Sequence, residues 1–111
     1  MKILLTGSNG MVGRNILQHP IASNHEILSP TKKELNLLDA LNVEKYINTK
    51  KLDMVIHAAG IVGGIQANMA YPVKFLVDNL QIGLNILIAS KIYGVKRFMI
   101  GFLFYRKLFN T

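Results

Sequence analysis

The sequence predicts an α/β protein that holds the N-terminal part of a doubly wound parallel sheet, in which about four strands alternate with helices. Three observations favour this fold class. The apolar run Lys2–Leu5 leads into the glycine-rich stretch Thr6–Gly13, short apolar runs of strand length recur along the chain, and segments with helical apolar spacing separate them. Short continuous apolar runs are typical of parallel strands that are buried on both faces.

The amino-acid composition limits the classes of protein to which the chain can belong. Half of the 111 residues are hydrophobic and 17% are charged, which excludes disorder by composition. The length fits one domain or a piece of one. Because the chain has no cysteine, a disulfide framework, a cysteine-type zinc site and a cysteine nucleophile are all excluded.

The formal net charge of +7 raises the question of a nucleic-acid or membrane partner. The basic residues are scattered singly or in pairs, with no stripe that is interleaved with aromatic residues; the pairs are Lys32-Lys33, Lys50-Lys51, Lys96-Arg97 and Arg106-Lys107. This pattern favours a solvated surface, and we predict no nucleic-acid and no membrane partner. The anionic phosphates of a cofactor would also suit such a surface.

Neither a secretory signal nor a membrane span is predicted. Ile3–Leu5 is too short for the apolar region of a signal peptide. Lys91, Lys96 and Arg97 interrupt the apolar C-terminal third before about 20 apolar residues accumulate. We therefore expect a cytoplasmic protein.

Three glycines, Gly7, Gly10 and Gly13, follow the first predicted strand. Gly7 allows a sharp turn, and Gly10 leaves room for a phosphate at the N-terminus of the next helix, where free amides and the helix dipole favour anions. Gly13 lets that helix pack closely on the strand. The Gly-x-x-Gly-x-x-Gly spacing is a variant of the dinucleotide fingerprint, and a flexible loop is the alternative interpretation of the glycines alone.

The next segments complete a strand-helix-strand unit. A helix is predicted over residues 11–19, ended by Pro20, and a short strand over residues 25–29. At this point a dinucleotide fold carries an acid for the ribose 2′-hydroxyl, or a basic residue where a 2′-phosphate must be held. Here the residues are Thr31-Lys32-Lys33, which favours NADP over NAD, with plain solvated charge as the alternative.

A second helix is predicted over residues 40–49 with Asp39 as its N-cap, and a third strand over residues 52–57. This strand ends in Ala58-Ala59-Gly60, small residues at a carboxyl end where a cofactor needs room. A catalytic role and a packed, hydrogen-bonded role are both open for His57. Its place at the end of a buried strand favours the packed role.

The remaining elements are a paired-glycine loop over residues 61–68, a long helix over residues 72–93 and a fourth strand over residues 96–101. Gly94 is the predicted C-cap of the long helix. Within this helix, Asn79, Gly83 and Asn85 interrupt the apolar rhythm. Glycine weakens a helix, so Gly83 predicts a close approach to a neighbouring element.

With these motifs in place, the chain resembles the extended short-chain dehydrogenase/reductases that act on nucleotide sugars, and within them the GDP-L-fucose synthase group. The resemblance rests on strings that occur in the same order, namely Gly10-Met11-Val12-Gly13, Glu34-Leu35-Asn36-Leu37-Leu38-Asp39, Val62-Gly63-Gly64-Ile65, Ala67-Asn68 and Tyr71-Pro72. It implies a Rossmann-type NADP-binding domain, N-terminal part, over residues 1–101. Residues 102–111 form a divergent tail.

The resemblance also implies a set of cofactor-binding residues and no metal site. The set comprises Gly7, Ser8, Asn9, Gly10, Met11, Val12 and Gly13 at the pyrophosphate, Thr31, Lys32, Glu34 and Leu35 at the adenosine, and Ala58 and Ala59 in the cleft. Pro30 stands where the family often has a basic residue. The NADP preference therefore rests mainly on Lys32.

The implied activity is that of an epimerase/reductase that makes GDP-L-fucose from GDP-4-keto-6-deoxy-D-mannose with NADPH, and full-length relatives are expected to be homodimers. The family's catalytic serine and cysteine follow the fourth strand, whereas Phe102–Thr111 has neither. The formal Tyr-x-x-x-Lys motif Tyr46–Lys50 precedes the third strand, on a predicted outer helix.

We therefore expect this truncated chain to be inactive by itself, and we assign it no catalytic residue. A GDP-L-colitose synthase-like epimerase/reductase is the alternative among enzymes. A non-catalytic NADP-binding fragment and a gene remnant without a retained role are the alternatives outside them.

Overall fold

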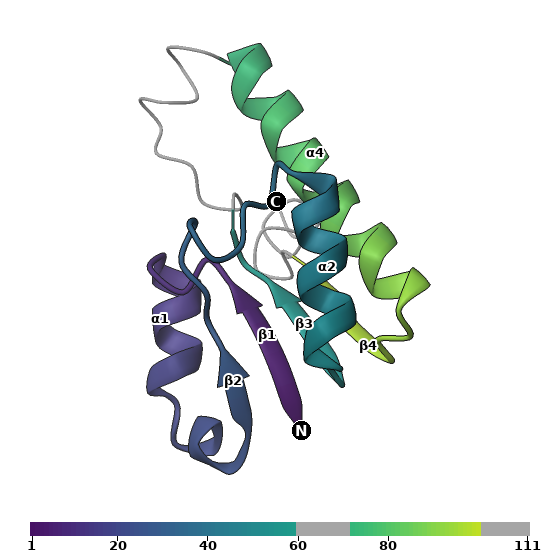
Figure 1. Ribbon diagram of the computed structural model, residues 1–111. Helices are drawn as coiled ribbons and strands as arrows, with labels where there is room; N and C mark the ends of the chain where they lie inside the picture. Colours follow the sequence, from purple (N-terminus) through teal and green to yellow (C-terminus); the bar gives the residue numbers. More distant parts are fainter. Residues whose placement is uncertain (60–71, 101–111) are drawn as a thin grey trace.

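The computed structural model describes residues 1–59 and 72–100, which form a parallel sheet with helices on both faces (Figure 1). The four strands are β1 (Lys2–Thr6), β2 (Glu26–Leu28), β3 (Met54–His57) and β4 (Arg97–Ile100). Their order across the sheet is β2-β1-β3-β4, and every pairing is parallel. The α/β fold class predicted from the sequence is confirmed.

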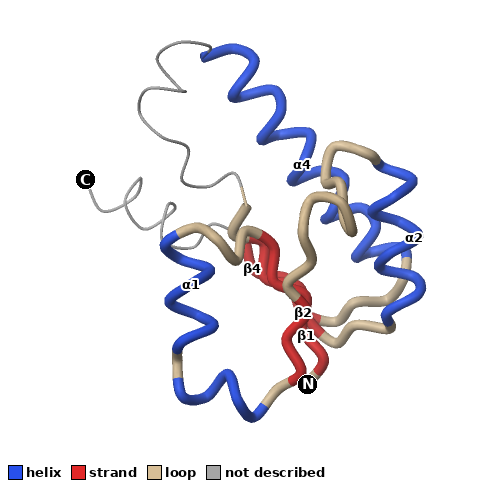
Figure 2. Tube along the Cα trace, turned by 60° about the vertical axis from the view of Figure 1, so that its left-hand side comes forward, coloured by secondary structure: helices blue, strands red, loops and turns tan. Residues whose placement is uncertain are grey.

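The helices divide between the two faces of the sheet. Helix α1 (Met11–Gln18) and the short 3-10 helix η1 (Pro20–Asn24) lie on one side, and α2 (Ala40–Lys50) and α4 (Pro72–Ile92) lie on the other (Figure 2). The chain leaves β1 in one direction through α1 and leaves β3 in the other through α4. The carboxyl edge between β1 and β3 is therefore a topological switch point, where open α/β sheets bind their ligands.

Local signals set the ends of the helices as predicted. The Asp39 carboxylate caps α2 by accepting a hydrogen bond from the Asn42 amide at 3.2 Å. Gly94, with φ +75°, follows α4, and the Val95 amide donates to the Ser90 carbonyl at 2.9 Å, as in a Schellman motif. Pro20 follows the end of α1 as expected, but it also begins η1, a 3-10 helix that was not predicted from the sequence.

Three predicted strands begin before the observed ones, and the fourth strand, expected from Lys96, begins at Arg97. The second strand was expected over residues 25–29 and comprises Glu26–Leu28, which pairs with Lys2–Leu4 of β1. The third was expected from Leu52 and begins at Met54. Leu52 is buried because it belongs to the core that lies between the sheet and the helices, and an apolar residue before a strand looks like part of the strand in sequence.

The core lies between the sheet and the layer of α2 and α4. Its buried members are Leu4, Leu35, Val43, Ile47, Leu52, Val55, Ile86 and Ala89. Ile3 and Leu5 are buried as well, on alternate positions of β1 from Leu4, so that β1 is covered on both faces. This burial explains why β1 reads as a continuous apolar run.

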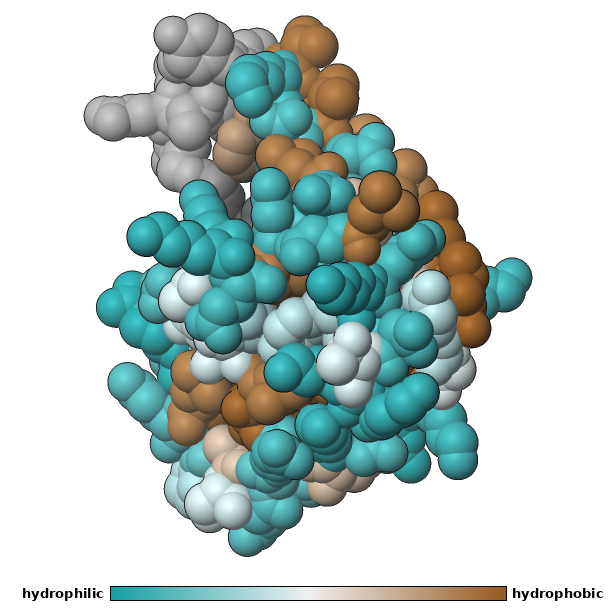
Figure 3. Space-filling model, viewed as in Figure 1, coloured by the Kyte–Doolittle hydropathy of each residue, from teal (hydrophilic) through white to brown (hydrophobic). Residues whose placement is uncertain are grey.

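Helix α4 has an unusual distribution of side chains. Polar Asn85 and Ser90 are buried, while apolar side chains are exposed along its length, namely Val73, Leu76, Val77, Leu80, Leu84, Leu87, Ile88 and Ile92. Figure 3 shows brown, hydrophobic surface over α4. By length and composition, Val73–Ile92 is apolar enough to cross a membrane, although core helices of soluble proteins pass the same test.

The glycines of α1 and α4 differ in their surroundings, and this difference gives a prediction. A Cβ at Gly13 would fall on the Gly7 carbonyl oxygen and lie 2.7 Å from the Ser8 Cα, whereas a Cβ at Gly83 would meet the Ile100 Cδ1 at 3.7 Å. Among the described residues, a Cβ at Gly83 would make only an ordinary van der Waals contact, so the close approach predicted there is not found. We expect Gly13→Ala to destabilise the protein by about 1–3 kcal/mol, since backbone must move. Gly83→Ala is expected to stabilise it by up to about 1 kcal/mol.

Urea unfolding followed by circular dichroism measures both effects. The matched pair separates helix propensity from packing, because each variant adds one methyl group within a helix. Equal free energies of unfolding for the two variants would contradict the packing that the structure gives Gly13.

Candidate functional site

The turn after β1 presents the first amides of α1 at the carboxyl edge of the sheet. Gly7 has φ +74°, and the Gly10 amide donates to the Gly7 carbonyl at 3.0 Å. Gly10 is the N-cap of α1, has no capping side chain, and no acidic residue lies in the first turn. Such a helix start offers amide groups and a positive dipole end to an anion.

Each of the three glycines is suited to its position for a separate steric reason. A Cβ at Gly7 would lie 2.5 Å from the Ala59 nitrogen, and one at Gly13 would collide with the Gly7 carbonyl group, so these two positions let the backbones of β1, α1 and the β3 end meet. A Cβ at Gly10 would approach only the Gly7 oxygen, at 3.4 Å, among the described residues. The space in front of Gly10 thus belongs to the cavity, as a ligand-binding glycine requires.

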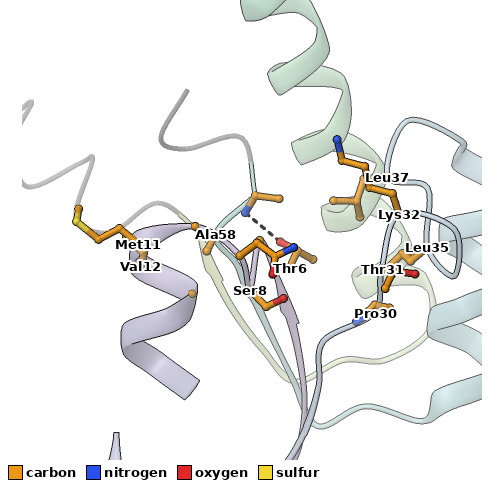
Figure 4. A pocket seen from close by; sticks show the side chains of 15 residues that line it. Thr6, Ser8, Met11, Val12, Pro30, Thr31, Lys32, Leu35, Leu37 and Ala58 are labelled. Atoms are coloured by element: carbon orange, nitrogen blue, oxygen red, sulfur yellow. Dashed lines mark hydrogen bonds between the residues drawn. The ribbon is translucent and has the colours of Figure 1, made fainter. Parts of the chain in front are cut away.

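A cavity of about 290 Å³ opens over this turn. Its walls come from the segments that follow β1, β2 and β3, as Figure 4 shows. The lining residues are Thr6, Gly7, Ser8, Asn9, Gly10, Met11, Val12, Gly13, Pro30, Thr31, Lys32, Leu35, Leu37, Ala58 and Ala59.

All predicted site residues except Glu34 line this cavity. Tertiary structure therefore brings together the three segments that the resemblance placed around a cofactor. Thr6, Pro30 and Leu37 also line it and were absent from the predicted set. Thr6 was predicted to begin the glycine-rich stretch and is the last residue of β1, and Leu37 belongs to one of the strings on which the resemblance rests. No pattern in the sequence singles out either residue as part of the site.

The chain segment after β2, which forms one wall of the cavity, is held in place by hydrogen bonds from helices α4 and α2. The Asn85 side chain of α4 donates to the Leu37 carbonyl at 2.9 Å and accepts from the Gln81 side chain at 2.7 Å. Within the wall, the Asn36 amide donates to the Asn42 side chain of α2 at 2.6 Å. The polar interruption of the apolar rhythm at Asn85 thus has a structural purpose, because it fixes the wall of the cavity.

Buried and partly buried hydrogen bonds join β1 to the end of β3 beneath the cavity. Thr6 Oγ1 lies 2.7 Å from His57 Nδ1, and the Ala59 amide donates to Thr6 Oγ1 at 3.2 Å. Thr6 and His57 are both 3% exposed. Burial lowers the pKa of His57 to about 4, so its imidazole is neutral at pH 7. This geometry confirms the packed, hydrogen-bonded role expected for His57, which does not line the cavity.

The formal Tyr46–Lys50 pair lies on α2 and outside the lining of the cavity. The Lys50 Nζ sits over the Tyr46 ring, 5.3 Å from its centroid. Burial, and secondarily the Glu34 carboxylate, raise the pKa of Tyr46. Tyr46 is partly buried against the core, and its raised pKa is the opposite of the lowered pKa that proton transfer near neutral pH requires, so the geometry gives this motif no catalytic role.

The alternation of parallel strands and helices, with a glycine turn at the switch point, defines a Rossmann-type domain. Residues 3–101 match the NAD dependent epimerase/dehydratase family. The chain belongs to this family.

Two curated relatives show how the similarity is distributed. GDP-L-colitose synthase of Yersinia pseudotuberculosis is 50% identical over 99 residues, which cover 89% of this chain and 32% of that protein. GDP-L-fucose synthase of Azorhizobium caulinodans is 48% identical over 89 residues, which cover 80% of this chain and 28% of that protein. The chain thus spans about a third of the length of the curated relatives that it matches.

Solved structures share the fold. The structure of DdhaC superposes with a TM-score of 0.81 at 31% identity, over 89% of this chain and 29% of that one. A GDP-L-fucose synthetase from Naegleria fowleri bound to NADP gives a TM-score of 0.72 at 29% identity, over 89% of this chain and 30% of that one. These neighbours place the chain among proteins with a Rossmann-type sheet.

The low pKa of His57 predicts a loss of stability in mild acid. The unfolded chain takes up a proton at His57 near pH 6.5, whereas the folded chain takes it up near pH 4. The neutral, buried imidazole therefore contributes fully to the free energy of unfolding above pH 6.5, and this contribution is lost as the pH falls toward 4. We expect a loss of up to about 3 kcal/mol between pH 7.5 and pH 4.

Urea unfolding at several pH values measures this loss. His57→Asn, whose side-chain oxygen can accept from the Thr6 hydroxyl, should flatten the dependence on pH. His19→Asn, which changes an exposed histidine, should retain it. An unchanged slope in the His57→Asn variant would show that other groups cause the loss.

Proposed function

We propose that this chain is the NADP-binding part of a nucleotide-sugar epimerase/reductase of the GDP-L-fucose synthase type. One observation carries the proposal: an uncapped helix start and the Lys32 side chain line the same cavity at the switch point of a parallel sheet. These two positive features suit the diphosphate and the 2′-phosphate of NADP. The names of the relatives support the GDP-sugar class.

The proposed assignment follows the lining of the cavity. Residues 7–13 would hold the diphosphate, because this segment combines the open Gly10 position with the start of α1. Thr31, Lys32 and Leu35 would hold the adenosine end, and Ala58 and Ala59 would give the remainder of the cofactor room beside β3. When bound, NADPH supplies a hydride, and the residues of this chain bind and orient it.

Proton transfer is a separate requirement. Reduction of a 4-keto sugar needs a proton donor for the developing alkoxide, and epimerisation needs an acid/base pair next to the ketone. Among the described residues, the only side chain of the lining that ionises is that of Lys32, and His57 lies beneath the cavity as a neutral imidazole. We therefore propose that this 111-residue chain by itself binds the cofactor without turnover.

The remaining parts of the proposal concern the substrate and the setting. A GDP-L-colitose synthase-like activity is a second candidate, favoured by the 50% identity to that enzyme. In either case the complete enzyme would act on a GDP-sugar in the cytoplasm and form homodimers, without a nucleic-acid or membrane partner. Residues 1–101 would form the cofactor-binding unit and residues 102–111 a tail.

Cofactor choice gives a direct test. We expect the chain to bind NADPH more tightly than NADH in isothermal titration calorimetry. Lys32→Ala should weaken NADPH binding by about tenfold and leave NADH binding within twofold, because only NADPH has a 2′-phosphate to pair with an ammonium group.

Lys33→Ala is the matched control. Lys33 is the neighbouring lysine, carries the same charge and does not line the cavity. An equal effect of the two substitutions would indicate general electrostatic attraction and contradict the assignment of Lys32.

Absence of turnover is the second test. With NADPH and GDP-4-keto-6-deoxy-D-mannose, we expect no oxidation of NADPH above the background rate at 340 nm in the steady state. Turnover near that of a complete GDP-L-fucose synthase would show that the chain holds its own proton donors.

A further inference from the structure

The turn that follows β2 is closed by reciprocal hydrogen bonds between Thr31 and Glu34. The Thr31 amide and its hydroxyl both donate to Glu34 Oε1, at 3.2 and 3.1 Å. In return, the Glu34 amide lies 3.4 Å from Thr31 Oγ1 and donates to the Thr31 carbonyl at 3.1 Å. Thr31-Lys32-Lys33-Glu34 is thus a capping box, a motif that usually starts a helix and here closes a single turn.

Within this turn, the charged groups of Lys32 and Glu34 lie in different places. Lys32 lines the cavity, on the wall that faces the glycine turn in Figure 4, whereas Glu34 does not line it. The Glu34 carboxylate instead contributes to raising the pKa of Tyr46, which places its charge near α2. The next residue, Leu35, is 4% exposed and anchors the end of the turn in the core.

A free carboxylate two residues from Lys32 would oppose the binding of a phosphate at this wall. In the observed arrangement its Oε1 accepts two hydrogen bonds from Thr31, so the carboxylate is held at the turn. A turn that is fixed before the ligand arrives also loses less conformational freedom on binding. Both effects favour a 2′-phosphorylated nucleotide.

We propose that Glu34 is a positioning residue for cofactor choice: through the Thr31–Glu34 capping box it holds the turn that directs Lys32 at the 2′-phosphate, and it does not itself contact the nucleotide. This inference rests on the proposed NADP-binding function. It replaces the direct adenosine contact that the sequence resemblance implied for Glu34 with an action through Lys32.

The test measures the binding of NADPH and NADH by calorimetry in single and double variants. Glu34→Ala should weaken NADPH binding by about fivefold, the effect of losing one capping interaction, and leave NADH binding within twofold. Glu34→Gln, whose side-chain oxygen can still accept from Thr31, should restore most of the NADPH affinity. In a Lys32→Ala background, Glu34→Ala should have no further effect, because the lysine through which it acts is absent.

Glu44→Ala on α2 is the matched control, since it removes the same charge from outside the turn and should leave the ratio of the two affinities unchanged. Equal losses for NADPH and NADH in both Glu34 variants would indicate direct contact with the nucleotide and overturn the proposal. Tighter NADPH binding by Glu34→Ala would show that the carboxylate only repels phosphate and would overturn it as well. If the unmutated chain bound neither nucleotide, the proposed function would fail, and this inference with it.

Discussion

The close approach of three backbone segments at the switch point is the constraint on which the rest of the site depends. Gly7 lets the end of β1 touch the Ala58-Ala59 segment, and Gly13 lets α1 sit on the Gly7 carbonyl. Any side chain at these two positions would push the helix start away from the sheet edge. The cavity lies at this edge because the chain leaves β1 and β3 in opposite directions.

The polar groups around the cavity fall into two classes with different tasks. One class faces the cavity and is positive or amide-like, comprising the start of α1 and Lys32. The other class is occupied within the protein. Thr6 and His57 bond to each other beneath the turn, and Asn85 reaches from α4 to hold the wall at Leu37. Thr6, His57 and Asn85 are thus occupied within the protein, while the start of α1 and Lys32 offer donors and a cation to an anionic ligand.

Helix α4 buries Ile86 and Ala89 in the core but departs from the usual amphipathic pattern in its other residues. It buries Asn85 and Ser90 while apolar residues such as Leu80, Leu84 and Leu87 remain exposed. Asn85 bonds to Leu37, and the Ser90 hydroxyl donates to the Ile86 carbonyl at 2.6 Å, so these buried polar groups are satisfied. Exposed apolar side chains gathered along one helix favour association with another surface.

The sequence by itself determined the order of strands and helices, the caps at Asp39 and Gly94, and the glycine turn, because each is a local pattern that acts within a few residues. Through family resemblance it also named most of the residues that line the cavity. The bond of Glu34 to Thr31 joins residues three positions apart in a T-x-x-E pattern that the sequence already contains, and the structure shows that Glu34 closes its own turn. Only the tertiary structure decided that Asn85 supports the cavity wall and that His57 is neutral and buried. These roles depend on contacts between residues about 50 positions apart, which no local pattern contains.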